Sequence, residues 1–385
     1  MAILLLILIY VAFISLGLPD TLVGAIWPLM QSDFNVPLWA AGLLSMITAI
    51  GTIVSSLLSS RFLFYLGTGK TILFSVLMTA IALYGFSITE NFLQLCLWAF
   101  PLGVGAGAID VALNNFVALY YKAKHMNWLH SFWGIGATTG PFIMALVIGA
   151  EGHWQSGYQI ISFLQLGLTL LLLLSLPLWK TMELAPSKRE PLQKKLLSNR
   201  ETLRLNGAFL SLIFFVGYAS IEITTGLWSG TYLVKKSGFS SEEAAFGVSL
   251  MFAFITFGRF LSGFLTAFYS NRQMIRFGLA VSVIGVFVLL LPLSSFFDFI
   301  GIILIGFGCA PIYPAMLHET PKRFGVENSQ NVIGLGMAGF YVGALSMPPA
   351  FGVIADLTAI SYLPVFLIFF IIFLFVVSEK LNRLT

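Results

Sequence analysis

The sequence predicts an all-α membrane protein whose twelve transmembrane helices form two bundles of six. Of its 385 residues, 58% are hydrophobic and only 9% are charged, whereas a soluble domain carries about 25% charged residues. Twelve apolar runs reach the ~20 residues that a helix needs to cross the hydrocarbon layer. One long polar stretch, 180–204, separates the first six runs from the last six. We therefore expect an N-terminal bundle at 1–179, a cytoplasmic linker at 180–204 and a C-terminal bundle at 205–385.

Each span is placed on the apolar run between two polar or turn-forming segments. The first run is too long for the apolar region of a signal peptide, so we expect it to be a retained helix. The predicted spans are 3–30, 38–60, 70–89, 92–121, 128–149, 157–179, 205–234, 243–268, 274–293, 297–320, 329–353 and 360–379.

Basic residues predict the orientation of these spans. Of the 20 Lys and Arg residues, 17 fall in loops and a tail that are cytoplasmic if the N-terminus is cytoplasmic. The outer loops hold only Lys235 and Lys236, and Arg259 lies within a span. Positive charge concentrates on the cytoplasmic side of membrane proteins. We therefore expect both termini in the cytoplasm of a multi-pass cell-membrane protein, and no nucleic-acid binding.

The chain lacks the motifs of an enzyme or a metalloprotein. Cys96 and Cys309 both fall in apolar runs, which argues against disulfides and against a cysteine-based metal site. No Walker A sequence, nucleophile elbow or Cys/His cluster is present. We expect no enzymatic activity, no cofactor and no metal, and we expect a monomer.

Asp110 is the most informative residue because it lies in the middle of an apolar run. An ionisable group at the centre of a membrane segment costs at least ~2.5 kcal/mol and normally faces a cavity or a partner. Gly103 and Gly105 precede it and allow another helix to approach, and Asn114 follows one helical turn later on the same face. Burial penalises the charged form of a carboxyl, which suits an acid that exchanges protons. The alternative is a structural acid satisfied by Asn114 or a serine.

Asp20 is a second acid within a span. Pro19 removes a backbone donor, and Gly24 follows nearby, so we expect the first helix to bend at this point. Asp20 and Asp110 lie in the same half of the chain, where both carboxyls could face one cavity. The alternative is that Asp20 caps a broken helix.

The corresponding acid of the second half is Glu222. The segment Asp20–Gly24 with Trp27 beyond it resembles Glu222–Gly226 with Trp228 beyond it, which is one sign of a weak parallel repeat of two six-helix halves. Such repeats are a known transporter architecture with the substrate site near the midplane. Glu222 either binds substrate or pairs with Arg259, and Arg259 otherwise anchors the cytoplasmic side of its span.

Several aromatic and polar side chains are candidate cavity liners. His130 and Trp133 are three residues apart and share a helix face, although His130 also suits an interfacial position. An aromatic ring can stack on a sugar, but it more often packs in the core. The candidate substrate-binding residues are Asn114, Trp27, Trp133, Glu222, Trp228, Tyr313, Tyr341, His130 and Gln165.

These motifs resemble the major facilitator superfamily over the whole chain, and within it the fucose permease-like group of sugar symporters. The resemblance rests on Gly103 to Asn114, on Leu129 to Pro141, on Tyr313-Pro314 and on Gly339 to Pro349. It implies the major facilitator fold, with Asp20 as the first-helix acid of the family and Asp110, followed by Asn114, as the fourth-helix acid. The fucose permease has glutamate where Asp110 stands and proline where Asn115 stands.

The resemblance and the membrane acids predict a secondary active transporter. We expect proton-coupled symport of a sugar or related polar solute by alternating access, with Asp110 and Asp20 coupling the proton. Its partners are then a small-molecule substrate, protons and the lipid bilayer. The alternatives are proton-coupled multidrug efflux, sodium-coupled sugar symport, and a receptor or scaffold without flux.

Overall fold

The computed structural model describes residues 2–121, 123–183 and 197–384. These residues contain 12 helical stretches that are long and apolar enough to cross a membrane. The helices are α1 (Ala2–Asp20), α2 (Leu22–Phe34), α3 (Ala40–Ser87), α4 (Phe92–Tyr120), α5 (Ala123–Gly149), α6 (Trp154–Glu183), α7 (Asn199–Leu203), α8 (Ala208–Lys235), α9 (Ser241–Leu265), α10 (Asn271–Leu290), α11 (Ser295–Cys309), α12 (Ile312–Leu357), the 3₁₀ turn η1 (Ile360–Tyr362) and α13 (Leu363–Leu384).

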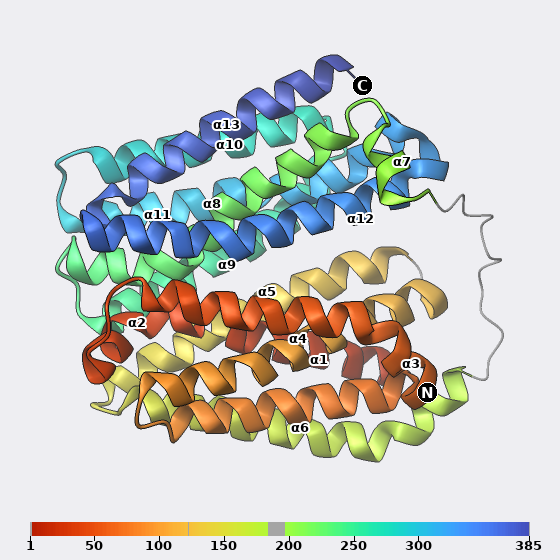
Figure 1. Cartoon of the computed structure of the whole chain (residues 1–385), viewed down its shortest axis with the longest axis horizontal. Helices are drawn as coiled ribbons and strands as arrows, with labels where there is room; N and C mark the ends of the chain where they lie inside the picture. The colour runs from red at the N-terminus through yellow and green to blue at the C-terminus, as the bar shows by residue number, and fades with distance from the viewer. Residues whose placement is uncertain (1, 122, 184–196, 385) are drawn as a thin grey trace. The chain divides into compact units, whose positions relative to one another are not determined.

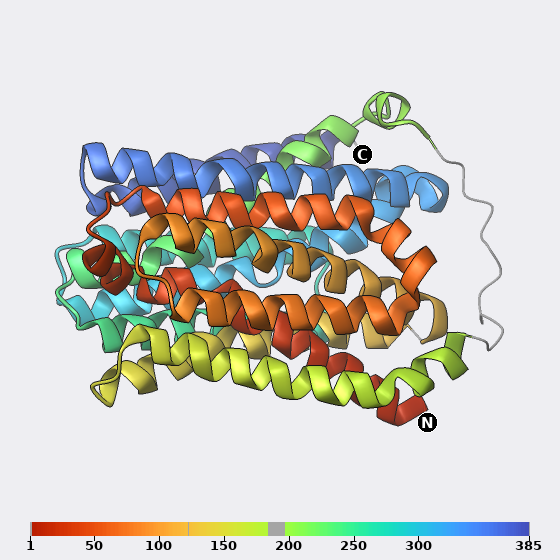
Figure 2. The same ribbon diagram turned by 60° about the horizontal axis from the view of Figure 1, so that its bottom comes forward.

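Helices and spans do not correspond one to one. The first span, Ile3–Phe34, consists of α1 and α2, and the tenth, Ser295–Gly325, consists of α11 and the start of α12. Conversely, α3 and α12 each double back and supply two spans (Figure 1 and Figure 2). The reversals lie at Gly67 (φ 74°, ψ 171°) and Gly325 (φ 75°, ψ 154°). Only glycine adopts these backbone angles without strain.

The twelve predicted spans are confirmed. The chain reverses at Gly67, which agrees with the predicted start of the third span at 70, although helix also continues through 61–66, which we expected to form an inner loop. Gly67 alone reverses the chain, so the turn needs almost no non-helical residues. The break that we expected near Pro19 is also present: α1 ends at Asp20 and α2 begins at Leu22.

The chain forms two compact units. Unit 1 comprises Met1–Glu190 with Ser241–Ser249, and unit 2 comprises Pro191–Ser240 with Leu250–Thr385. The domain bounds 1–179 and 205–385, and the cytoplasmic position of the termini, remain predictions.

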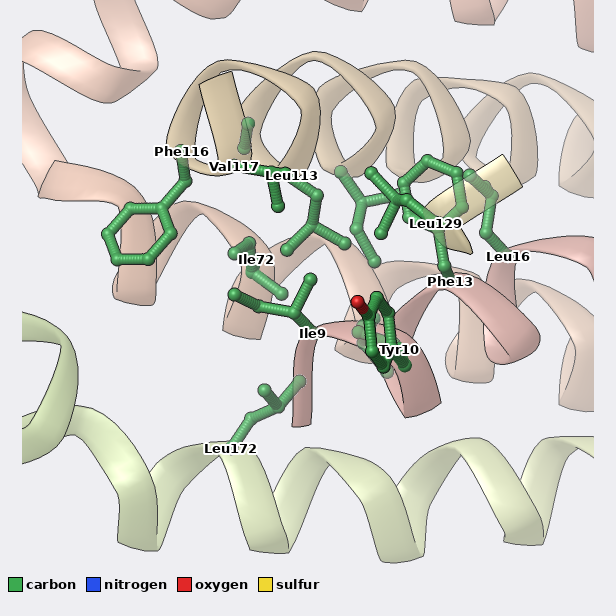
Figure 3. Close-up of a cluster of buried hydrophobic side chains, with 14 of the residues drawn as sticks. Ile9, Tyr10, Phe13, Leu16, Ile72, Leu113, Phe116, Val117, Leu129 and Leu172 are labelled. Atoms are coloured by element: carbon green, nitrogen blue, oxygen red, sulfur yellow. The ribbon is translucent and has the colours of Figure 1, made fainter. Parts of the chain in front are cut away.

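The core of unit 1 is a cluster of apolar side chains from five helices. Figure 3 shows Ile9, Phe13 and Leu16 of α1 facing Leu113 and Phe116 of α4. The cluster also takes side chains from α3, α5 and α6, represented in the same view by Ile72, Leu129 and Leu172. Because lipid is as apolar as these side chains, van der Waals packing rather than transfer from water holds such helices together. This core fixes α1, α4 and α5, which carry Asp20, Asp110 and Trp133.

In unit 2, α8 is the central helix and packs against α11, α12 and α13. Its buried aromatic residues include Phe214, Tyr218, Trp228 and Tyr232. Glu222 lies on this same helix with 5% of its surface exposed. A carboxyl on the most enclosed helix of the unit requires a specific partner.

Candidate functional site

The break between α1 and α2 positions Asp20. Pro19 has no backbone N–H, so the carbonyl of Ser15, four residues earlier, loses its helical donor. The side chain of Gln165 on α6 replaces that donor, with Nε2 donating to the Ser15 carbonyl oxygen at 2.7 Å. The Gln165 Oε1 in turn accepts from Thr79 Oγ1 at 3.0 Å. Gln165 is 1% exposed. Its amide therefore supports the break, and we leave Gln165 out of the proposed substrate contacts.

A second proline-freed carbonyl lies on α5. Pro141 cannot donate to the carbonyl of Ala137, and Thr21 Oγ1 donates to that oxygen instead, at 2.9 Å. Thr21 is the residue between α1 and α2. The hydrogen bond therefore joins the break in the first span to the part of the fifth span that precedes Pro141.

Close packing joins α1 to α5 on both sides of these hydrogen bonds. A Cβ atom added to Gly136 would lie 2.0 Å from the carbonyl oxygen of Ile14, and one added to Gly17 would lie 2.2 Å from that of Trp133. The two backbones are thus in contact, as small residues permit between membrane helices. Asp20 and Trp133 are held at a fixed separation.

Asp20 accepts a hydrogen bond from Trp133. The indole Nε1 donates to Oδ2 at 2.8 Å. Asp20 is an exposed residue, whereas Trp133 is half-buried and packs partly against the apolar core of unit 1. A carboxylate accepting from an indole N–H is a charge-assisted hydrogen bond, about twice as strong as a neutral one.

Asp110 is bonded to Asn114, as the sequence predicts for residues one turn apart. Asn114 Nδ2 donates to Asp110 Oδ1 and to the Asp110 backbone carbonyl, both at 2.9 Å. Both residues are half-buried on α4. The Asp110 carboxyl also interacts electrostatically with Asp20. Unit 1 therefore brings together two interacting acids, each with one neutral hydrogen-bond donor.

The glycines that precede Asp110 have the role that the sequence indicates. A Cβ atom on Gly103 would lie 1.9 Å from the carbonyl oxygen of Thr48 on α3. The helix that approaches is thus the second span, and it fixes the part of α4 from which Asp110 projects.

The other candidates of unit 1 pack against aromatic side chains. His130 is exposed and presents its ring edge-on to Phe13 at 5.6 Å between centroids. Trp27 is completely buried and contacts Phe92 edge-on at 6.3 Å. Its Nε1 is a buried atom with no hydrogen-bond partner among the described residues.

In unit 2, Glu222 pairs with Arg259. The Arg259 Nη2 lies 2.7 Å from Glu222 Oε1 and 3.3 Å from the Tyr218 hydroxyl. The side chains are 16% exposed for Arg259 and 5% for Glu222. Of the alternatives that the sequence left open, the ion pair is present, and the expected role of Arg259 as a cytoplasmic anchor is replaced by pairing across α8 and α9.

The remaining candidates of unit 2 contact protein groups. Trp228 is fully buried, and its Nε1 donates to the carbonyl oxygen of Pro348 at 2.9 Å. Tyr313 is half-buried, lies 5.7 Å from the ring of Tyr218 between centroids, and donates its hydroxyl to Met337 Sδ at 3.1 Å. Tyr341 is half-buried. Tyr313 thus joins the Glu222–Arg259 cluster, whereas Trp228 supports α12.

Sequence reasoning missed the supporting roles of Gln165 and Thr21. A signal for them existed, since each proline within a helix frees the carbonyl four residues earlier and predicts a side-chain donor nearby. Which side chain supplies that donor depends on the packing of α5 and α6. No group of His, Cys, Asp and Glu that could hold a metal ion occurs in the described part of the chain.

Comparison with known proteins identifies the family. The family model of the Major Facilitator Superfamily matches residues 9–291 and 210–381. The chain belongs to the Major Facilitator Superfamily. It is a membrane transporter with the fold of that superfamily, and not an enzyme.

Relatives of this transporter differ in what their names say they carry. The chain is 23% identical to Bypass of stop codon protein 6 of Saccharomyces cerevisiae over 92% of this chain and 77% of that protein. It is 21% identical to the glucose/mannose transporter GlcP of Bacillus subtilis, over 80% and 77% of the two chains. It is 24% identical to the cis,cis-muconate transport protein of Acinetobacter baylyi, over 70% and 66%.

A solved structure supports the fold. The inward-facing, unoccupied crystal structure of a bacterial homolog to the human lysosomal transporter Spinster matches with a TM-score of 0.76 at 14% identity, covering 98% of this chain and 97% of that one. At this identity the match shows the shared fold alone.

Proposed function

We propose that this superfamily member is a proton-coupled symporter of a sugar or a related polar solute, working by alternating access in the cell membrane. The observation that carries the proposal is the presence in unit 1 of two acids within membrane spans, Asp110 and Asp20, each hydrogen-bonded to a neutral donor. Within the described residues, neither acid forms an ion pair with Lys or Arg. Their charge is therefore available for neutralisation by a proton.

Asp110 is the main proton carrier in this proposal. Its neighbour Asn114 donates to Oδ1, which orients the carboxyl without neutralising it. Proton binding removes the charge and lowers the cost of enclosing the carboxyl in a closing, drier cavity. The loaded carrier then changes conformation more readily than the empty, charged one, which couples solute movement to the proton gradient.

Two relatives inform the choice of solute. The name of GlcP supports a hexose. The name of the muconate transport protein supports an organic anion. A half-buried aromatic side chain such as that of Trp133 suits the ring of a sugar.

The test is uptake by the purified protein in proteoliposomes. Radiolabelled D-glucose, D-mannose and cis,cis-muconate are each offered with an inward pH gradient, and then with an inward sodium gradient at fixed pH. We expect accumulation of one solute under the pH gradient only. Accumulation driven by sodium would establish the sodium-coupled alternative, and transport that removes solute against the imposed gradient would establish an efflux antiporter.

The variant Asp110→Asn assigns the role of the carboxyl. We expect it to lose accumulation above the equilibrium level, because amide cannot take up a proton. Asp33→Asn is the matched control, because Asp33 is another acid of unit 1 with a neutral hydrogen-bond donor, Trp154 Nε1 at 2.6 Å, but it lies at the end of α2. Full proton-driven accumulation by Asp110→Asn would contradict the proposal.

A further inference from the structure

The contact between Trp133 and Asp20 has a chemical asymmetry. An indole N–H only donates, so it bonds well to a charged carboxylate and more weakly to a neutral carboxylic acid. The observed bond, Nε1 to Oδ2 at 2.8 Å, is therefore strongest when Asp20 is charged. Protonation of Asp20 weakens it.

The helices that carry these two side chains cannot separate to follow such a change. The backbone of Trp133 lies against Gly17, where a Cβ atom would be 2.2 Å from the Trp133 carbonyl oxygen. Thr21 binds the Ala137 carbonyl one turn further along α5. Because both backbones are fixed, it is the side chain of Trp133 that moves when the bond weakens.

The environment of Trp133 permits that response. The side chain is half-buried, with part of its surface against the apolar core of unit 1 and part open. Among the described residues, the charged group that acts on Asp20 is Asp110 of α4. On α5, the titratable neighbour His130 presents its ring edge-on to Phe13. The indole is thus the neutral group that responds directly to the charge of Asp20.

We infer that Trp133 is the positioning residue that links protonation of Asp20 to solute binding. While Asp20 is charged, it holds the indole N–H. When Asp20 is protonated, the N–H becomes available to an oxygen of the solute, such as a sugar hydroxyl, and the ring is available to stack on the solute. The solute then binds best to the protonated carrier, which is the condition for symport. The inference rests on the proposed function.

The first test needs no solute. Tryptophan emission of the purified protein is titrated between about pH 5 and pH 9. We expect a transition in the wild type that is absent from both Trp133→Phe and Asp20→Asn. The matched control Trp154→Phe removes the other indole–aspartate contact of unit 1, at Asp33, and should keep the transition. A transition that persists in Asp20→Asn comes from another group and overturns the inference.

The second test separates coupling from a structural role. In the D-glucose uptake assay, loss of the N–H in Trp133→Phe removes a bond that favours charged Asp20. The pH of half-maximal uptake should move to higher pH by about one unit, a tenfold change in proton concentration. Trp154→Phe should leave it unchanged. A uniform loss of uptake with an unmoved pH profile would make Trp133 merely structural. Absence of pH-driven uptake of all three solutes in the wild type would instead refute the proposed function, and the emission titration would still decide the inference.

Discussion

At the scale of single residues, unit 1 depends on two side chains that replace hydrogen bonds lost to proline. Gln165 donates to the carbonyl freed by Pro19, and Thr21 donates to the one freed by Pro141. Both carbonyls lie inside the protein at membrane depth, where no water compensates for a missing donor. The broken first helix that presents Asp20 is therefore stable because α5 and α6 supply or accept these bonds.

Replacing Gln165 by Leu should destabilise the protein by about 1–3 kcal/mol, because the Ser15 carbonyl is left buried without a donor. The measurement is thermal unfolding in detergent, with the free energy compared between variants. Pro19→Ala supplies the control, since alanine restores the N–H that the Ser15 carbonyl needs. Gln165→Leu should cost clearly less in the Pro19→Ala background. An equal cost in both backgrounds would show that Gln165 acts through packing alone.

The ion pair of Glu222 and Arg259 differs from the acids of unit 1 because its acid has a charged partner. Removing one partner leaves an uncompensated buried charge, which costs far more than replacing both partners by apolar groups. A change in the charge of Glu222 therefore costs free energy unless the charge of Arg259 changes as well. For this reason we assign proton coupling to Asp110 and Asp20, whose observed donors are neutral, rather than to Glu222.

At the scale of elements, the pair α1–α5 is the frame of the candidate site. Its close approach depends on glycines that face carbonyl groups of the opposite helix, including Gly136 against Ile14. A helix backbone cannot move aside for an added carbon atom as the end of a flexible side chain can. Any added carbon at this position therefore displaces one helix, and with it either Asp20 or Trp133.

Gly136→Ala should be destabilising by about 1–3 kcal/mol or more, the usual cost of overpacking, and should impair uptake. Gly167→Ala on α6 is the matched control because nothing lies within 4 Å of its added Cβ atom. That change should be neutral or stabilising by up to ~1 kcal/mol, since alanine favours the helix. Thermal unfolding and uptake are measured for both variants. Equal behaviour of the two would show that the α1–α5 contact is not required.

The spans could be predicted from the sequence because each apolar run must match the thickness of the bilayer. The reversal at Gly67 could not be placed as well, since the segment 61–70, which we expected to form an inner loop, continues as helix on both sides of one glycine with φ 74°. A bend near Pro19 was predictable because proline removes a backbone donor and Gly24 follows nearby. The donors that make the break stable were not, because they come from helices distant in the sequence.

At the scale of the whole molecule, the two units differ in the partners of the ionisable residues in their membrane spans. Unit 1 holds two acids that interact with each other, Asp20 and Asp110, whereas unit 2 holds an acid–base pair, Glu222 and Arg259. The positions of all four residues were predictable, because ionisable residues in apolar runs are conspicuous. The partner of Asp110 was predictable because Asn114 is one helical turn away, and the pairing of Glu222 with Arg259 was one of two alternatives. The contact of Trp133 with Asp20 required the packing of α1 on α5.

Orientation in the membrane is the remaining whole-molecule prediction. Most Lys and Arg residues fall in predicted inner loops, so the α8–α9 connection should face outward and the α9–α10 connection inward. The outer connection does carry Lys236, but Lys236 pairs with Asp298 at 2.9 Å. The excess of Lys and Arg that orients the chain therefore comes from the inner loops.

Cysteine labelling in intact cells tests this orientation. Ser240→Cys and Ala267→Cys place single thiols at exposed positions in the two connections, after replacement of Cys96 and Cys309 by Ala. A membrane-impermeant maleimide should label position 240 directly and position 267 only after permeabilisation, because the intervening span α9 separates the two faces of the membrane. The reverse pattern would invert the chain and place both termini outside. Labelling of both positions in intact cells would contradict α9 as a spanning helix.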